Sequence, residues 1–166
     1  MRILGVDPGL ANTGWSVVET DGNRYSVVEY GVIKTSTEDE PVKRISTISS
    51  KIVEIAKQFN CTGCGAEDIF FTKNVSSAIS VAKVIGAFSV SLFKENIDVC
   101  LFTPTEIKKA IVGVGGADKE QIRMMVMVTT GMKDKIKSDH AADSVAAAIT
   151  YITTRPMRLA TGRKLP

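Results

Sequence analysis

The sequence is poor in cysteine and in aromatic residues, and it has no large excess of either charge. Of its 166 residues, three are cysteines and 6% are aromatic, and the formal net charge is only +3. An odd, small number of cysteines argues against a disulfide framework. A net charge this mild does not by itself indicate a nucleic-acid-binding protein. With 44% hydrophobic and 23% charged residues, the composition is that of an ordinary globular protein.

The sequence also lacks a leader-like beginning and a long uninterrupted apolar run. Asp7 comes too early for a secretory signal peptide, and we expect no segment that approaches the roughly 20 apolar residues of a membrane-spanning helix. We therefore predict a cytoplasmic protein that does not associate with membranes.

Two of the cysteines have the spacing of a zinc-ligand pair. Cys61 and Cys64 are separated by two residues, but a structural zinc site needs four ligands. The other candidates, Cys100 and His140, lie far away in the sequence. A metal or redox role for the pair is therefore the less favoured alternative.

The length of the chain is that of one domain. Its last twelve residues contain no acidic residue and four basic ones, namely Arg155, Arg158, Arg163 and Lys164. We predict one domain over residues 1–154 and a basic tail over residues 155–166. The tail is either a phosphate-binding arm or a solvated end, and charge alone does not decide between them.

The order of strand and helix patterns is typical of an α/β fold. We expect strands at residues 3–6, 14–19, 25–34, 63–68 and 99–102. We expect helices near residues 41–59, 75–93, 105–111, 119–130 and 138–153. Turn sequences of the hairpin type make the first three strands antiparallel neighbours, whereas a strand–helix–strand order predicts parallel pairing for the later strands.

The helix expected at residues 75–93 is apolar on more than one face. Val81, Ile85 and Phe88 belong to one face, whereas Ile79 and Val90 lie elsewhere. Either the helix is buried on all sides, or it is shared between a core and a dimer interface. We favour the shared helix.

Acidic residues follow two of the expected strands. Asp7 ends the first strand before a Pro-Gly turn, and Glu67 ends the short fourth strand. Each has a plain alternative, because an Asp-Pro-Gly turn is common and the end of a strand often carries a solvated acid such as Asp68.

The last helix opens with a third acidic motif, Asp139-His140-Ala141-Ala142-Asp143. Its spacings place the acidic and histidine side chains close together on one helix face. The plain alternative is a capping segment that complements the helix dipole.

Together these acidic groups favour a metal centre. Carboxylates that converge from two strands and a helix repel one another, and bound divalent cations relieve that repulsion. Two such ions stabilise both the attacking and the leaving oxygens of a phosphodiester displacement.

Four motifs in order resemble the RuvC family: residues 3–9, residues 67–74, residues 112–119 and residues 140–143. The resemblance covers nearly the whole chain. It implies an RNase H-like fold with a mixed five-stranded sheet, flanked by helices, whose first three strands are antiparallel. It also implies a homodimer that cuts four-way (Holliday) DNA junctions in recombination and repair.

The resemblance assigns the metal ligands to Asp7, Glu67, His140 and Asp143, with Mg²⁺ or Mn²⁺, two ions to a site. Some members of the family carry aspartate where this chain has His140, so Asp139 is an alternative ligand. A branch-migration helicase complex of the RuvA/RuvB type is the implied protein partner.

The resemblance further implies that Lys108 and Lys119 approach the scissile phosphate, and that Phe70, Lys73 and Asn74 contact DNA. Solvated lysines and a core phenylalanine are the alternatives, although Lys119 opens a helix, where backbone N–H groups also favour anions. Family members often have arginine where this chain has Ile85, so a DNA or subunit contact at that position is in doubt.

Two other classes of function compete with a junction nuclease. The Asp7 motif also resembles the phosphate-binding turn of actin-like kinases, but those need a second domain that this length does not provide. A non-cleaving protein that binds DNA junctions is the remaining alternative, although it has no need of an acidic cluster.

Overall fold

The computed structural model describes the backbone of residues 1–69 and 75–160, and the side chains in these ranges as far as Arg155. The strands are β1 (Arg2–Asp7), β2 (Asn12–Thr20), β3 (Tyr25–Lys34), β4 (Gly63–Glu67) and β5 (Asp98–Phe102). The helices are α1 (Pro41–Gln58), α2 (Val75–Lys94), α3 (Pro104–Val112), α4 (Lys119–Thr130) and α5 (Asp139–Ala160).

The five strands form one mixed sheet in the order β3-β2-β1-β4-β5. The hairpin strands β1, β2 and β3 pair antiparallel, and β4 pairs parallel with β1 and with β5. This arrangement confirms the predicted mixed sheet, with its first three strands antiparallel.

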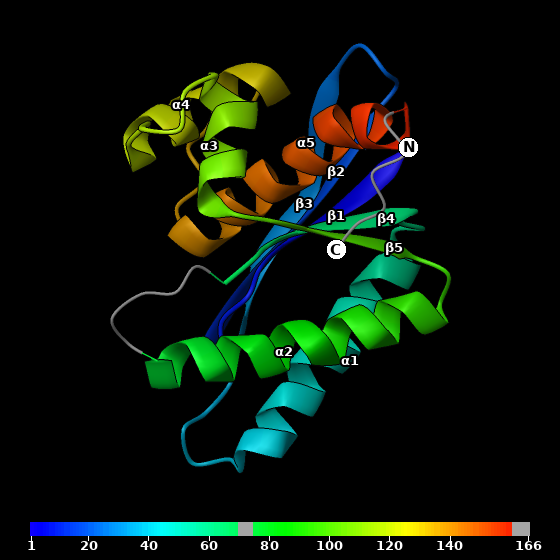
Figure 1. The fold of residues 1–166 in the computed structure, drawn as a ribbon, viewed down its shortest axis with the longest axis vertical. Coiled ribbons are helices and arrows are strands. Elements are labelled where there is room, and N and C mark those ends of the chain that lie inside the picture. Colours follow the sequence, from blue (N-terminus) through cyan, green and yellow to red (C-terminus); the bar gives the residue numbers. More distant parts are fainter. Residues whose placement is uncertain (70–74, 161–166) are drawn as a thin grey trace.

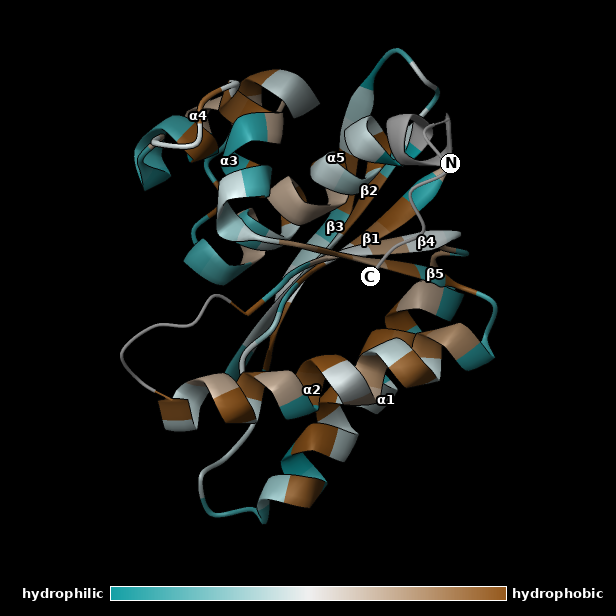
Figure 2. Ribbon diagram, in the orientation of Figure 1, coloured by the Kyte–Doolittle hydropathy of each residue, from teal (hydrophilic) through white to brown (hydrophobic). Residues whose placement is uncertain are grey.

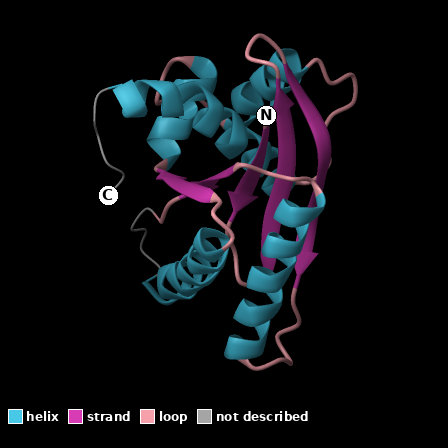
Figure 3. Cartoon of the chain, turned by 90° about the vertical axis from the view of Figure 1, so that its right-hand side faces the viewer, coloured by secondary structure: helices cyan, strands magenta, loops and turns pink. Residues whose placement is uncertain are grey.

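Helices cover both faces of the sheet (Figures 1 and 3). Successive strand residues point to opposite faces, so Leu4 and Val6 of β1 pack against α1 and α2 in one core. Ile3 belongs to the second core, beneath α3, α4 and α5. Side chains that point to the same face of the sheet as Ile3 therefore lie on the side that α5 covers.

Helix α5 lies unusually close to the sheet because glycines face it. An added Cβ at Gly5 would meet the main-chain carbonyl of Ser144, and one at Gly14 would meet the carbonyl of His140. Gly65 faces Ala147 in the same way. The backbone of α5 therefore rests directly on β1, β2 and β4.

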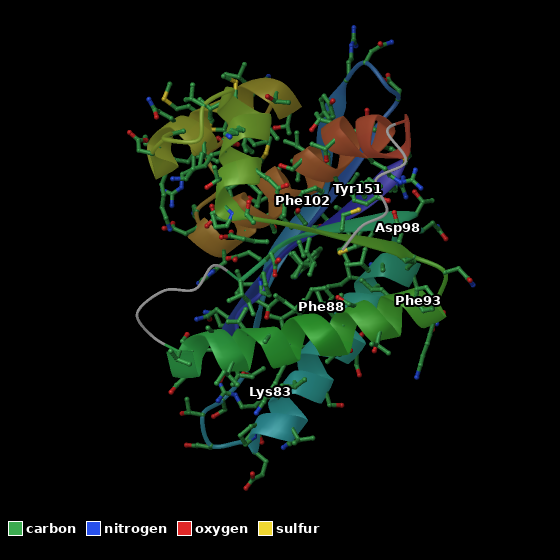
Figure 4. All side chains as sticks on the ribbon, in the orientation of Figure 1. Lys83, Phe88, Phe93, Asp98, Phe102 and Tyr151 are labelled. Atoms are coloured by element: carbon green, nitrogen blue, oxygen red, sulfur yellow. The ribbon has the colours of Figure 1, made fainter. Side chains whose placement is uncertain are left out.

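Helix α5 extends past the predicted start of the basic tail and runs to Ala160. Within it, Arg155 donates from Nε to Asp98 at 3.4 Å and lies 5.7 Å from the centre of the Tyr151 ring. Figure 4 shows Tyr151 and Asp98 at the end of the sheet where β5 begins. Residues 161–166 and the Arg158 side chain lie outside the described residues, so a role for the tail stays a prediction.

Helix α2 is long and apolar enough, by length and composition alone, to cross a membrane. The expectation that no segment approaches this limit is therefore wrong. One such helix is weak evidence, because core helices of soluble proteins pass the same test. Val84, Ile85, Phe88 and Leu92 of α2 are buried against α1 and the sheet, and hydrophobic colouring recurs along the helix in Figure 2.

Candidate active site

The ends of two parallel strands bring the first two acidic residues together. Strand β1 ends in Gly5-Val6-Asp7 and β4 ends in Gly65-Ala66-Glu67. Their register pairs Gly5 with Gly65 and Val6 with Ala66, so Asp7 and Glu67 are the next residues on neighbouring strands. Both share the face of their strand's glycine, which is the face covered by α5.

The first turn of α5 adds two more of the predicted ligands. His140 Nδ1 lies 2.7 Å from Asp7 Oδ2, at hydrogen-bonding distance. Because a carboxylate only accepts, the ring nitrogen donates here. Asp143 follows one turn later, and its charge interacts with that of Asp7. The structure therefore places His140 against Asp7, with Asp143 close enough for its charge to act on Asp7.

Burial raises the pKa values of all three carboxyl groups, and repulsion between negative charges adds to the rise at Glu67 and Asp143. Burial raises the pKa of Glu67 to about 7, with further increases from the charges of Asp7 and Asp143. Burial also raises the pKa of Asp7, against the opposing effect of its bond to His140. The pKa of Asp143 rises because of burial and the Asp7 charge. Shifts of this kind are typical of functional sites.

Two lysines approach the same cluster from capped helices. Lys119 is the first residue of α4, which begins with a capping box between Asp118 and Gln121. Lys108 lies in α3, which begins with a capping box between Thr103 and Glu106. The positive charges of both lysines partly offset the rise in the pKa of Glu67.

Two hollows meet at Glu67. The first, of about 160 Å³, is lined by Asp7, Glu67, Asp68 and residues of α2. The second, of about 180 Å³, is lined by Glu67, Asp143, Lys108 and Lys119. Glu67 therefore borders an acidic hollow and a second hollow that is lined by both acidic and basic groups.

Among the described residues, no three His, Cys, Asp or Glu side chains converge closely enough to hold one ion as they stand. The donors nevertheless suit a hard divalent cation, because three buried carboxylates repel one another beside a histidine. Ion binding by these residues therefore requires some rotation of their side chains.

Asp139, the alternative ligand, is engaged elsewhere. Its Oδ1 forms an ion pair with Nη2 of Arg123, which lies on α4. Sequence reasoning missed Arg123, although its position four residues after Lys119 places both on one face of α4. Sequence reasoning also missed Arg44 of α1, which lines a hollow of about 360 Å³ together with His140.

Several other predicted positions do not join the cluster. Phe70, Lys73 and Asn74 lie outside the described residues, so their DNA contacts stay predictions. Ile85 is only 6% exposed and packs in the core with α1. The Ile85 side chain is therefore part of the core, at the position where a DNA or subunit contact was in doubt.

The cysteines are packed as core residues. All three are free and buried, with Cys61 and Cys64 in one core and Cys100 in the other. Burial raises the pKa of Cys61 to about 11 and raises that of Cys64 as well. Thiols of this kind are unreactive.

The raised pKa of Glu67 predicts a pH-dependent cost in stability. A carboxyl group whose pKa rises from 4.5 to about 7 on folding binds its proton more tightly in the folded protein. The free energy of unfolding therefore falls as pH rises through that window. In the presence of a chelator, we expect Glu67→Gln to be more stable than wild type by about 2–3 kcal/mol near pH 8, and equally stable near pH 4.5. Urea unfolding at both pH values measures this, and an equal difference at both would contradict it.

Comparison with known proteins agrees with this site. Residues 3–151 match the family model described as Crossover junction endodeoxyribonuclease RuvC. The protein of that name from Fusobacterium nucleatum is 36% identical over 163 residues, covering 98% of this chain and 86% of its own length. The one from Finegoldia magna is 38% identical over 152 residues, covering 92% of this chain and 93% of its own length.

Solved structures give the same result. The chain matches the RuvC structure of Thermus thermophilus with a TM-score of 0.88 and 29% identity, covering 95% of this chain and 96% of that one. It matches T. thermophilus RuvC in complex with a Holliday junction substrate with a TM-score of 0.85, 26% identity and the same coverage. The predicted RNase H-like fold is thereby confirmed. From its sequence and its fold alike, the chain belongs to the RuvC family of crossover junction endodeoxyribonucleases.

Proposed function

We propose that this protein resolves four-way DNA junctions by hydrolysing phosphodiester bonds at the cluster around Asp7, in recombination and repair. The observation that carries the proposal is the meeting of three electrostatically coupled carboxylates and two lysines at Glu67. Acidic groups facing a polyanion repel it unless cations intervene, so a site used only for DNA binding has no need of them.

Asp7, Glu67, Asp143 and His140 would hold the divalent cations, Mg²⁺ or Mn²⁺, two to a site. When bound, such ions activate water and stabilise the charge that develops on a phosphate. His140 orients Asp7 through its Nδ1–H. Glu67, whose raised pKa favours its protonated form below about pH 7, would give up that proton in order to hold a cation.

Lys119 and Lys108 would hold the phosphate over the cluster. Both line the hollow that contains Glu67 and Asp143. Phe70, Lys73 and Asn74 would also contact the DNA.

A cleavage assay separates the two candidate functions. Purified protein with Mg²⁺ or Mn²⁺ should cut a synthetic four-way junction and leave a linear duplex of the same sequence intact. Binding of the junction without cleavage in either metal would favour the non-cleaving alternative.

A homodimer would supply two identical sites for two symmetric cuts. The exposed face of α2 is the surface we propose for it. Val75, Ile79, Val90 and Phe93 are each more than half exposed, and their spacings of 4, 11 and 3 residues place them on one stripe. Gly86 lies on this stripe with nothing within 4 Å of an added Cβ, which lets a second helix approach closely.

A charge on this stripe should break the dimer. Phe93→Glu buries a carboxylate in the proposed interface, and we expect it to weaken dimerisation at least about thirtyfold, since an aromatic anchor contributes about 2 kcal/mol or more. Val128→Glu is the matched control, because Val128 is 75% exposed on α4, away from the stripe. Sedimentation equilibrium measures both. A wild-type monomer with full cleavage would contradict the dimer.

Three further assignments belong to the proposal. A branch-migration helicase complex of the RuvA/RuvB type is the proposed protein partner, and the cytoplasm is the proposed compartment. The basic residues of the tail would contribute phosphate contacts. Arg155 is the least suited of them, because it is bonded to Asp98.

A further inference from the structure

Two groups in the first turn of α5 compete for one role. His140 and Asp139 are adjacent, and either side chain supplies a metal ligand in principle. Asp139 is four residues before Asp143, so the two carboxylates lie on neighbouring turns of one helix face. Their proximity is electrostatic as well, because the Asp139 charge raises the pKa of Asp143. Asp139 is therefore within reach of the cluster.

A guanidinium group from another helix holds Asp139. Arg123 Nη2 pairs with Asp139 Oδ1, and Nη1 lies 3.9 Å from Glu120 Oε2. Glu120 in turn accepts from Lys135 Nζ at 2.7 Å. The chain of charges thus begins at Lys135, between α4 and α5, passes through two residues of α4 and ends at the first residue of α5.

The arginine is fixed more firmly than its partner. The Arg123 side chain is 21% exposed, whereas that of Asp139 is 55% exposed. Arg123 lines a hollow of only about 10 Å³ together with Val126, Ile136 and Ala142, so its stem is closely packed. Because Arg123 is the more closely packed partner of this ion pair, its position determines where the Asp139 carboxylate lies.

We propose that Arg123 is a positioning residue, which holds Asp139 away from the acidic cluster and so leaves the ligand role to His140. The inference rests on the proposed metal site. Hard cations such as Mg²⁺ prefer carboxylate oxygen to imidazole nitrogen. A released Asp139 would therefore compete with His140 for the ion, and the ion pair prevents this.

The test compares the effect of His140→Ala in two backgrounds. We expect His140→Ala alone to raise the Mn²⁺ concentration for half-maximal binding at least about tenfold, since the loss of an outer-shell partner of a metal ligand already costs about that much. In the Arg123→Gln background the same change should raise it less than about threefold, because the released Asp139 takes over. Mn²⁺ binding is measured without DNA by electron paramagnetic resonance, whose nitrogen coupling also reports whether imidazole is bound.

Asp139→Asn is the matched control, because it breaks the same ion pair but leaves no free carboxylate. In the Asp139→Asn background, His140→Ala should still raise the Mn²⁺ concentration for half-maximal binding by the full amount. Asp139→Asn by itself should keep the full nitrogen coupling. Adding Asp139→Asn to Arg123→Gln should restore both the effect of His140→Ala on Mn²⁺ binding and the nitrogen coupling. Arg123→Lys keeps the positive charge and should behave nearly as wild type. A merely structural role would make Arg123→Gln and Asp139→Asn equivalent.

An effect of His140→Ala that is equal in the wild-type and Arg123→Gln backgrounds would overturn the inference. Failure of the wild-type protein to bind Mn²⁺ at all would overturn the metal site and the inference with it. Mn²⁺ binding that follows the expected pattern, without junction cleavage, would support the role of Arg123 and count against the proposed function alone.

Discussion

Replacing Asp7 by asparagine is expected to abolish junction cleavage and to leave junction binding intact. Asp7 is 17% exposed at the centre of the cluster, and asparagine keeps its shape and its acceptor for His140. The change removes a negative charge beside the DNA phosphates, so binding in a chelator should hold or tighten. Cleavage should fall at least about a thousandfold, which corresponds to about 4 kcal/mol of transition-state stabilisation.

Single-turnover cleavage and a binding titration on the same junction measure the two effects. Asp39→Asn is the charge-matched control, because Asp39 is paired with the exposed Lys43 at the surface, and such pairs contribute little. Loss of binding together with cleavage in Asp7→Asn would show that Asp7 supports the fold or the DNA, and an unchanged cleavage rate would remove it from the active site.

Replacing Gly5 by alanine is expected to destabilise the fold and to disrupt the site without altering any charge. The added methyl group would collide with the Ser144 carbonyl and lie 2.7 Å from Ser16 Oγ. A main-chain carbonyl within a helix does not move aside alone, so α5 must shift. We expect a loss of about 3 kcal/mol in the free energy of unfolding, at the upper end of the usual cost of overpacking, and weaker Mn²⁺ binding.

Gly116→Ala is the matched control for this loss. Gly116 is exposed in the loop before α4, and an added Cβ there meets nothing within 4 Å. Its stability should change by less than about 1 kcal/mol. Urea unfolding of the two variants makes the comparison, and equal stabilities would show that α5 does not need the glycine at position 5.

Local sequence signals account for much of the fold. The bounds of α4 were predicted to the residue, since Asp118 caps its beginning and Gly131 takes a left-handed conformation at its end. The turn Asp21-Gly22-Asn23 placed the beginning of β3 equally well. Both features depend on residues within a few positions of one another, which sequence patterns report directly.

Contacts between distant residues account for what was missed. The end of α5 was placed too early because the basic residues there indicate a tail, while the bond from Arg155 to Asp98 joins positions 57 apart. The pairing of Arg123 with Asp139 was missed for the same reason. A cluster of acids from two strands and a late helix was predicted from the ends of those elements, whereas the assignment of the four proposed ligands came from the resemblance, which joined motifs that no local pattern connects.

The proposed site depends on α5, which is synthesised after all the strands that it covers. Domains generally begin to fold from the N-terminus while synthesis continues. Until α5 has emerged, β1, β2 and β4 lack the helix that covers them. The same unfinished chain has Asp7 and Glu67 but neither His140 nor Asp143. If these four residues form the active site as proposed, a ribosome-bound fragment has no complete centre for cutting DNA, and nuclease activity arises only in a chain that has finished folding.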